Sequence, residues 1–327
     1  MTIVQQPPVH GRRASATPKR ASGVVLPSVS LVVPSHGRPA PLATCIDAIA
    51  QLDYPKELLE VIVVDDDSLE PVVGRFPRPD GLSLRVIRQE RTGPGGARNA
   101  GVAVAEGGVI AFVDDDCAPA SDWLRRIVAP LSGEARVIAG GETVNALTGN
   151  PYSVASQALV SYLYAHYAKG RPSLRFFTTN NLALRRDLFT KVGGFNPEFR
   201  QAAGEDREFC VRCARLGIEL VHVHEAVVYH AHPLTWRTFW RQHYTYGREA
   251  HRFHALQERA DGRPFEVEPL AFYARMLAYP FRSGEPRALA VTGLLGMSQL
   301  ANTSGFFREA VRSRAQSRAA RRATTGA

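Results

Sequence analysis

Short apolar runs alternate with amphipathic segments along the first half of the chain. The runs at 28–34 and 59–64 are rich in β-branched residues, which is typical of buried strands, and runs at 84–87 and 109–113 predict two more. Between them, apolar residues at helical spacing predict helices after residue 38 and over about 97–105. Continuous apolar strands that alternate with helices indicate a mostly parallel sheet sandwiched by helices. We therefore expect a Rossmann-like α/β fold.

The second half has a weaker pattern with more helix. We expect a short strand over 137–139, a helix over 153–167, a strand within 178–184, a helix after 204–206, a strand over 221–230 and a helix over 235–254. The uncharged segment 288–307 contains Thr, Ser, Gln, Asn and three Gly, so it favours an interfacial or core helix over a transmembrane span. The expected parts are a disordered basic tail (1–27), an α/β domain (28–235), a helical C-terminal region (236–307) and a second basic tail (308–327).

Charge is concentrated at the two ends of the chain. Residues 1–27 carry four Lys/Arg and no acid, and residues 308–327 carry six Arg and one Glu. The remaining residues, 28–307, carry thirty basic and thirty acidic side chains, so their charges balance. This balance argues against a basic nucleic-acid cleft, whereas the tails either stay solvated or contact anionic lipid.

Cysteine use indicates a reducing environment. The four cysteines are too few and too scattered for a disulfide framework, and no apolar signal segment opens the chain. We expect a cytoplasmic protein, with the inner face of the cell membrane as one option. Cys210 and Cys213 lack the second pair that a tetrahedral zinc site needs, so they are expected to pack.

Polar clusters follow three of the expected strands, at 35–38, 65–68 and 114–116. In parallel sheets, ligands bind beyond the carboxyl ends of the strands, so these clusters predict one crevice. The triplet Asp114-Asp115-Asp116 is costly unless a cation or hydrogen-bond donors neutralise it. We expect Asp114 and Asp116 to converge on one Mg²⁺ or Mn²⁺ ion, the alternative being an exposed acidic turn before the next helix.

Other polar residues complete the predicted crevice. A carboxylate in 65–67 could accept hydrogen bonds from a base or a ribose, and Arg98, after a glycine-rich turn, could neutralise phosphate. Asp206 opens a helix, where the helix dipole would keep it ionised and able to act as a base, although acids are common at helix starts. His230 and His232 end a strand and are not expected to point the same way, so one could complete the metal site, or both could only pack.

Seven motifs together resemble a known family. SLVVPSHGR, VIVVDDDS, GPGGARNAG, IAFVDDDC, TNNLALRR…VGGFNPEF, GEDREF and VVYHAHP occur in this order over about residues 28–232. The chain resembles a bacterial-type family-two glycosyltransferase with a GT-A fold. The resemblance implies an inverting transfer of a sugar from a nucleoside diphosphate sugar, of UDP type, to an acceptor hydroxyl.

The resemblance also implies roles for single residues. Asp206 would be the general base, and Asp114, Asp116 and His230 would bind the Mn²⁺ or Mg²⁺ ion. The nucleotide-sugar donor would be bound by Pro34, Ser35, Arg38, Asp66, Arg98, Asn99, Asp115 and Glu205.

Two features limit the class of enzyme. The segment 236–248 lacks the QxxRW motif of processive polysaccharide synthases, which favours a single-addition enzyme. The sequence does not decide whether the acceptor is a lipid-linked glycan, a polysaccharide or a small molecule. Peripheral contact with a membrane is one option. Two alternatives stay open: a sugar nucleotidyltransferase, although a triphosphate-binding loop is missing, and a nucleotide-sugar-binding protein without turnover.

Overall fold

One sheet organises the N-terminal two thirds of the protein. The computed structural model describes residues 25–76, 78–133, 136–170, 176–262 and 267–325. Within them, eight strands pair in the order β3-β2-β1-β4-β7-β6-β8-β5. Their bounds are β1 (Val29–Ser35), β2 (Leu59–Asp66), β3 (Ser83–Gln89), β4 (Val109–Phe112), β5 (Cys117–Pro119), β6 (Val137–Asn145), β7 (Leu182–Arg185) and β8 (Glu219–His230).

The half of the sheet that comes first in sequence is parallel, as predicted. β1 pairs in parallel with β2 and with β4, and β2 pairs in parallel with β3. Every residue of β1 is buried, because successive side chains enter different cores: Leu31 and Val33 belong to one, and Val32 to the other. An apolar run without polar alternation is therefore what a strand covered on both faces requires.

The other half of the sheet is mixed. β7 is antiparallel to both of its neighbours, β4 and β6, whereas β8 is parallel to β6, and β5 is antiparallel to β8. The sequence pattern located β7 and β8 but not their directions, and β5 was not expected because three residues carry no periodicity. The α/β class is confirmed, with more antiparallel pairing than predicted.

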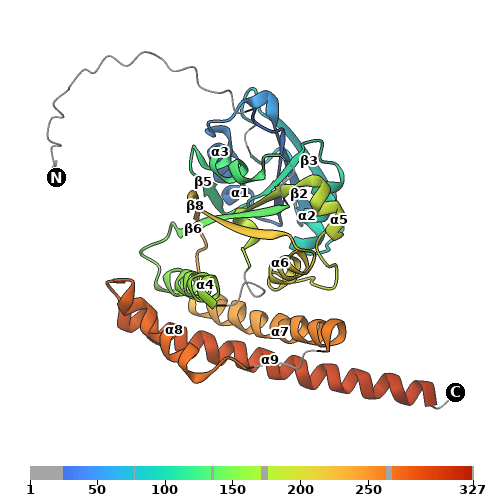
Figure 1. The fold of residues 1–327 in the computed structure, drawn as a ribbon, viewed down its shortest axis with the longest axis vertical. Helices are drawn as coiled ribbons and strands as arrows, with labels where there is room; N and C mark the ends of the chain where they lie inside the picture. Colours follow the sequence, from blue (N-terminus) through green and yellow to red (C-terminus); the bar gives the residue numbers. More distant parts are fainter. Residues whose placement is uncertain (1–24, 77, 134–135, 171–175, 263–266, 326–327) are drawn as a thin grey trace.

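Helices cover both faces of the sheet and form a separate layer beside it (Figure 1). Residues of α1 and α3 share a core with one face, and residues of α2, α5 and α6 share a core with the other. Cys210 and Cys213 of α6 are buried in this second core, as expected. The helices are α1 (Pro39–Ala50), α2 (Pro94–Ala103), α3 (Trp123–Val128), α4 (Pro151–Gly170), α5 (Arg186–Val192), α6 (Glu205–Arg215), α7 (Trp236–Asp261), α8 (Leu270–Arg282) and α9 (Ala288–Thr325), with 3-10 turns η1 (Lys56–Leu58), η2 (Ala129–Leu131) and η4 (Thr179–Asn181).

The separate layer consists of α4, α7, α8 and α9, and it has a core of its own that includes Phe239, Met276 and Leu295. α7 and α9 lie side by side in Figure 1 and approach closely through glycines. A Cβ atom at Gly247 would lie 1.8 Å from the Asn302 carbonyl oxygen, and one at Gly305 would lie 2.0 Å from that of Tyr244. The two backbones therefore touch, which only glycine permits at these positions.

The expected boundary at residues 307 and 308 lies inside α9. Glu309 accepts hydrogen bonds from Arg248 and Arg252 of α7, so packing between the two helices continues beyond the uncharged segment. This ionic contact stabilises α9 beyond the point where its charged residues begin. Of the expected N-terminal tail, residues 1–24 lie outside the described residues. No helix in the described part of the chain combines the length and apolar character needed to cross a bilayer.

Candidate active site

The acidic triplet follows β4 at the carboxyl end of the sheet, next to the end of β1. The Val113 amide donates to the Val32 carbonyl, which keeps the two chains together up to this point. Asp115 is fully buried, and its carboxylate accepts a hydrogen bond from Ser35 Oγ over 2.7 Å and pairs with Arg38. Burial raises the pKa of Asp115 to about 7, although the Arg38 charge opposes the shift. The structure therefore brings Ser35, Arg38 and Asp115 together, and their contact with a donor stays a prediction.

Asp116 is surrounded by cationic and imidazole groups. Arg38 Nη1 donates to Asp116 Oδ2 over 2.7 Å, His230 Nε2 lies 3.2 Å from Oδ1, and His232 Nδ1 lies 3.4 Å from Oδ2. Burial alone would raise the pKa of this carboxyl, but hydrogen bonds from the two histidines hold it well below its usual range. The expectation that the histidines point differently was wrong, because residues two apart in an extended segment present their side chains to the same face.

The surroundings of Asp116 fit a divalent cation. Asp116, Cys117 and His230 offer ligand atoms that all lie within 4.8 Å of one another. Adjacent ligands of an ion with bonds of about 2.1 Å lie roughly 3 Å apart, close to the 3.2 Å that separates His230 Nε2 from Asp116 Oδ1. The Asp116 carboxylate and the His230 imidazole therefore suit the predicted ion, whereas the Cys117 thiol is a softer ligand than Mg²⁺ or Mn²⁺ prefers.

Asp114 faces a different partner. Arg98, whose side chain is 3% exposed, donates from Nη2 to Asp114 Oδ1 over 2.6 Å and from Nη1 to Glu205 Oε1 over 3.1 Å. The sequence predicts that Asp114 and Asp116 converge on one ion. In the structure the two carboxylates do not converge, because the Asp114 carboxylate pairs with Arg98. A metal contact by Asp114 stays a prediction and would require it to reorient.

Asp206 is the second residue of α6, beside Glu205. The side chain is partly buried, and its Oδ1 accepts a hydrogen bond from the Arg207 amide over 2.7 Å. Burial, and then the neighbouring charge of Glu205, raise the pKa of Asp206 to about 7. The sequence predicts that the helix N-terminus keeps this carboxylate ionised, but burial and the charge of Glu205 act on its pKa in the opposite direction. A carboxyl group with this pKa suits proton transfer near neutral pH.

Asp66 holds the loop that precedes α2. Its carboxylate accepts hydrogen bonds from the backbone amides of Thr92 and Gly93, each over 2.9 Å, and from Gln89 Nε2 over 2.8 Å. Gly93 has φ of +86°, and a Cβ there would lie 2.2 Å from the Arg200 carbonyl oxygen. Asp66 therefore positions a tight turn between β3 and α2, and its contact with a base or a ribose stays a prediction.

Two other predicted donor residues have structural contacts. Asn99 donates to the Phe195 carbonyl and accepts from the Phe195 amide, each over 2.8 Å, so its amide group clamps the turn after α5. Pro34 is buried within β1, in register with Val64 of β2. Neither contact tests the predicted role in donor binding.

A polar chain that the sequence did not reveal links the site to the helical layer. His232 Nε2 lies 2.8 Å from Gln242 Oε1, and Gln242 Nε2 donates to Ser156 Oγ and to the Tyr246 hydroxyl. Gln242 and Tyr246 are one turn apart on α7, and Ser156 belongs to α4. The only sequence signal was the aromatic and basic composition of α7, which does not point to individual residues.

The fold and the site define an α/β protein whose polar cluster lies at the carboxyl ends of its parallel strands, where such sheets bind ligands. Residues 30–196, slightly more than half of the chain, match the family described as Glycosyl transferase family 2, and residues 162–233 match the N-terminal domain of galactosyltransferase. The chain belongs to glycosyltransferase family 2.

Individual relatives agree with this assignment. The chain is 28% identical over 209 residues to glycosyltransferase AglE of Haloferax volcanii, which covers 63% of this chain and 67% of AglE. It is 28% identical over 232 residues to a Bacillus subtilis protein named as probable glycosyltransferase YdaM, covering 66% of this chain and 54% of that protein. The chain thus spans only about half the length of YdaM.

A solved structure supports the GT-A fold. Mannosyltransferase PcManGT from Pyrobaculum calidifontis, determined in complex with GDP-Man and Mn²⁺, superposes with a TM-score of 0.63 at 20% identity, over 88% of each chain.

Proposed function

We propose that this protein transfers a sugar from a nucleoside diphosphate sugar to an acceptor hydroxyl in a single in-line displacement. One observation carries the proposal: Arg98 joins Asp114, next to the donor-side residues, to Glu205, next to Asp206. The predicted base and the acidic triplet therefore belong to one connected cluster. Family membership supports the same reaction class.

The mechanism assigns one step to each part of this cluster. Asp206 accepts the proton of the acceptor hydroxyl while the acceptor oxygen forms a bond to the anomeric carbon of the sugar. The bond from that carbon to the diphosphate oxygen breaks, and the nucleoside diphosphate leaves. Since only one displacement occurs, the configuration at the anomeric carbon inverts. Arg98, held between two carboxylates, keeps Glu205 and hence the start of α6 in place.

Asp116 and His230 would hold the divalent cation. Mn²⁺ or Mg²⁺ bound there would neutralise charge that develops on the leaving diphosphate. His232 also reaches the Asp116 carboxylate, and Asp114 could join after leaving Arg98. Arg38 would stay as a fixed positive charge on the donor side, since it already pairs with two carboxylates.

A binding and turnover screen tests the proposal. Thermal shifts with nucleoside diphosphates and their sugars, each with Mn²⁺ or Mg²⁺, identify the base and the sugar, because a ligand of the native state raises the melting temperature. We expect a UDP-type donor to give the largest shift and to release nucleoside diphosphate. Donor binding without any release or transfer would support a binding protein instead, and pyrophosphate release from a nucleoside triphosphate would support a nucleotidyltransferase.

We also propose that α9 brings the enzyme to a membrane surface and so favours a lipid-linked acceptor. Leu300, Phe307 and Val311 of α9 are 63%, 63% and 68% exposed, at helical spacing, and Arg308 and Arg312 are exposed beside them. Apolar side chains flanked by arginines suit the headgroup region of an anionic bilayer. The acceptor would then be presented at the inner face of the cell membrane.

Co-sedimentation with vesicles tests the membrane contact. The full chain should pellet with phosphatidylglycerol vesicles and much less with phosphatidylcholine vesicles. The pair Phe307→Ser and Val311→Ser should abolish pelleting and leave donor hydrolysis unchanged. Equal pelleting of this variant and the wild type would contradict the contact, and a soluble small-molecule acceptor would then be favoured.

A further inference from the structure

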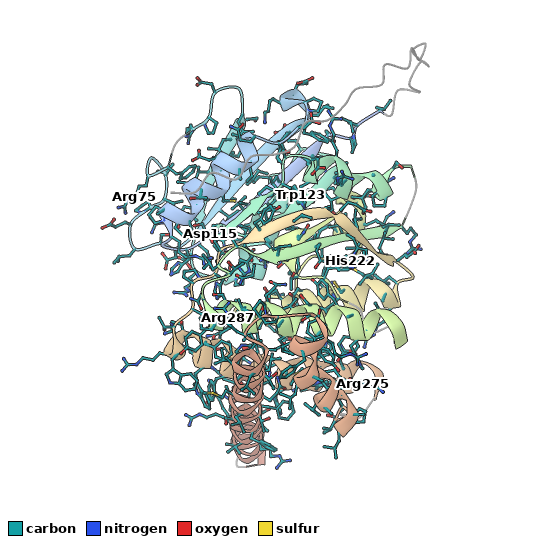
Figure 2. All side chains as sticks on the ribbon, turned by 90° about the vertical axis from the view of Figure 1, so that its left-hand side faces the viewer. Arg75, Asp115, Trp123, His222, Arg275 and Arg287 are labelled. Carbon is teal, nitrogen blue, oxygen red and sulfur yellow. The ribbon has the colours of Figure 1, made fainter. Side chains whose placement is uncertain are left out.

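Two histidines and a glutamate gather on the sheet, away from the acidic triplet. His222 and His224 are two apart on β8, and Glu142 is on the neighbouring strand β6. Their ligand atoms all lie within 4.8 Å of one another. His222 is near the start of β8, whereas His230 of the candidate active site ends the same strand. Figure 2 shows His222 and Asp115 well apart across the sheet.

The distances in this cluster are longer than those of ordinary hydrogen bonds, and one of them matches the separation of metal ligands. His222 Nε2 lies 3.3 Å from Glu142 Oε2, and His224 Nδ1 lies 3.7 Å from the same oxygen. A tetrahedral site with bonds of about 2.05 Å has ligand atoms about 3.3 Å apart, while hydrogen bonds of this type usually measure about 2.7–3.2 Å. His222 Nε2 is also buried without a hydrogen-bond partner among the described residues. The nitrogen of His222 is therefore free to bind an ion together with the nearby atoms of Glu142 and His224.

A local irregularity of the strands creates this arrangement. Gly141 is in register with Val223, but Glu142 is in register with Val227, so residues 224–226 form an extra segment on β8. Such bulges redirect side chains and are common next to functional sites. Asn181 Nδ2 holds the bulge, because it donates to the carbonyl oxygens of Glu142 and Ala226 over 2.9 and 3.0 Å.

The histidine rings are positioned and still accessible. The rings of Tyr164 and Phe177 pack against His222 at centroid distances of 5.7 and 5.5 Å, which fixes its orientation. The His224 side chain is 74% exposed, so it leaves a path from solvent. Three ligands with one open side are typical of a zinc site that completes its coordination with water.

We propose that Glu142, His222 and His224 form a Zn²⁺ site that fastens β6 to β8 at the bulge. Two imidazoles and one carboxylate favour zinc over the hard cations that the acidic triplet suits. The proposal is independent of the glycosyl transfer, because none of the three residues belongs to the candidate active site.

Calorimetric titration with Zn²⁺ tests the site in the full chain without a histidine tag. The other group of possible ligands contains Asp116, Cys117 and His230, so the variant His230→Ala is used as the background to weaken it. This variant should bind one Zn²⁺ ion per chain, and the bound ion should raise its melting temperature. Adding His224→Ala or Glu142→Gln should weaken binding at least about tenfold and remove the thermal shift. Adding Glu225→Gln, an exposed carboxylate on the same bulge, is the matched control and should change neither quantity.

Two results would overturn the proposal. One is the absence of Zn²⁺ binding in the His230→Ala background. The other is an unchanged affinity after His224→Ala, an exposed position whose substitution leaves the core intact. Neither result bears on sugar transfer, which is measured separately by release of nucleoside diphosphate.

Discussion

Arg98 Nη1 donates a hydrogen bond to Glu205 Oε1 over 3.1 Å, although 107 residues separate them in sequence. The contact joins the helix after the glycine-rich turn to the helix that carries Asp206. Both side chains are almost fully buried, so the pair is protected from the solvent screening that makes surface ion pairs weak. It therefore sets the position of the proposed base relative to the donor side of the crevice.

Replacement of Arg98 by Met should destabilise the fold and reduce activity. Two carboxylates, Asp114 and Glu205, would lose their shared counter-charge, and removal of one partner from a buried pair costs about 3–5 kcal/mol. The free energy of unfolding from urea titration measures the loss. The double variant Arg98→Met with Glu205→Gln should recover part of the stability, since one uncompensated charge is removed. If the double variant is as unstable as the single one, the pairing with Glu205 is not the source of the loss.

Asp206→Asn should reduce kcat and spare donor binding. Loss of a general base typically lowers the rate by about 10²–10⁴-fold, while the asparagine keeps the size of the side chain. Steady-state kinetics and the dissociation constant of the donor, measured on the same preparation, separate the two effects. Asp187→Asn, in the first turn of α5, is the matched control and should retain full kcat. Full turnover by Asp206→Asn would refute the base assignment.

The rate should depend on pH through Asp206. Burial and Glu205 raise its pKa to about 7, so the fraction able to accept a proton grows as pH rises from 6 to 8. We expect kcat/KM for the acceptor to increase over this range, with an apparent pKa that belongs to the Asp206 and Glu205 pair. This increase of kcat/KM between pH 6 and pH 8 should be absent from the Asp206→Asn variant. A profile with its midpoint near pH 4 would show that the carboxyl is not perturbed.

Stability should change with pH in the opposite direction. The folded-state pKa of Asp206 lies above its unfolded value of 3.8, so the folded chain holds this proton more tightly. The resulting stabilisation is complete below pH of about 4 and is lost as pH rises through about 7. Between pH 5 and pH 8, the free energy of unfolding should therefore fall by roughly 1–2 kcal/mol more in the wild type than in Asp206→Asn, after allowance for the partial exposure of the side chain. Urea titrations at both pH values measure the difference, and parallel losses in the two proteins would contradict it.

The sequence predicted the parts of the molecule that local pattern determines. Apolar runs located β1, β2 and β4, and the rule that ligands bind at strand ends brought Ser35 and Asp115 to one crevice. The Asn99 clamp on Phe195 and the chain from His232 through Gln242 could not be predicted. Each joins segments that only tertiary packing brings together, and polar residues on a helix surface give no signal of which distant group they meet. The partner of Asp114 was missed for the same reason, since Arg98 was expected to face phosphate.

Substitutions at two glycines should separate helix packing from helix propensity. Gly247→Ala places a methyl group 1.8 Å from the Asn302 carbonyl oxygen, so α7 and α9 must move apart, at a cost of about 1–3 kcal/mol that exceeds the gain in helix propensity of about 1 kcal/mol. Gly293→Ala in α9 meets no atom within 4 Å and should gain about 0.5–1 kcal/mol. Urea titration of both variants compares them directly. Because Tyr246 neighbours Gly247 and hydrogen-bonds Gln242, Gly247→Ala should also lower kcat, whereas Gly293→Ala should not. Stabilisation by both alanines would show that the helices do not pack this closely.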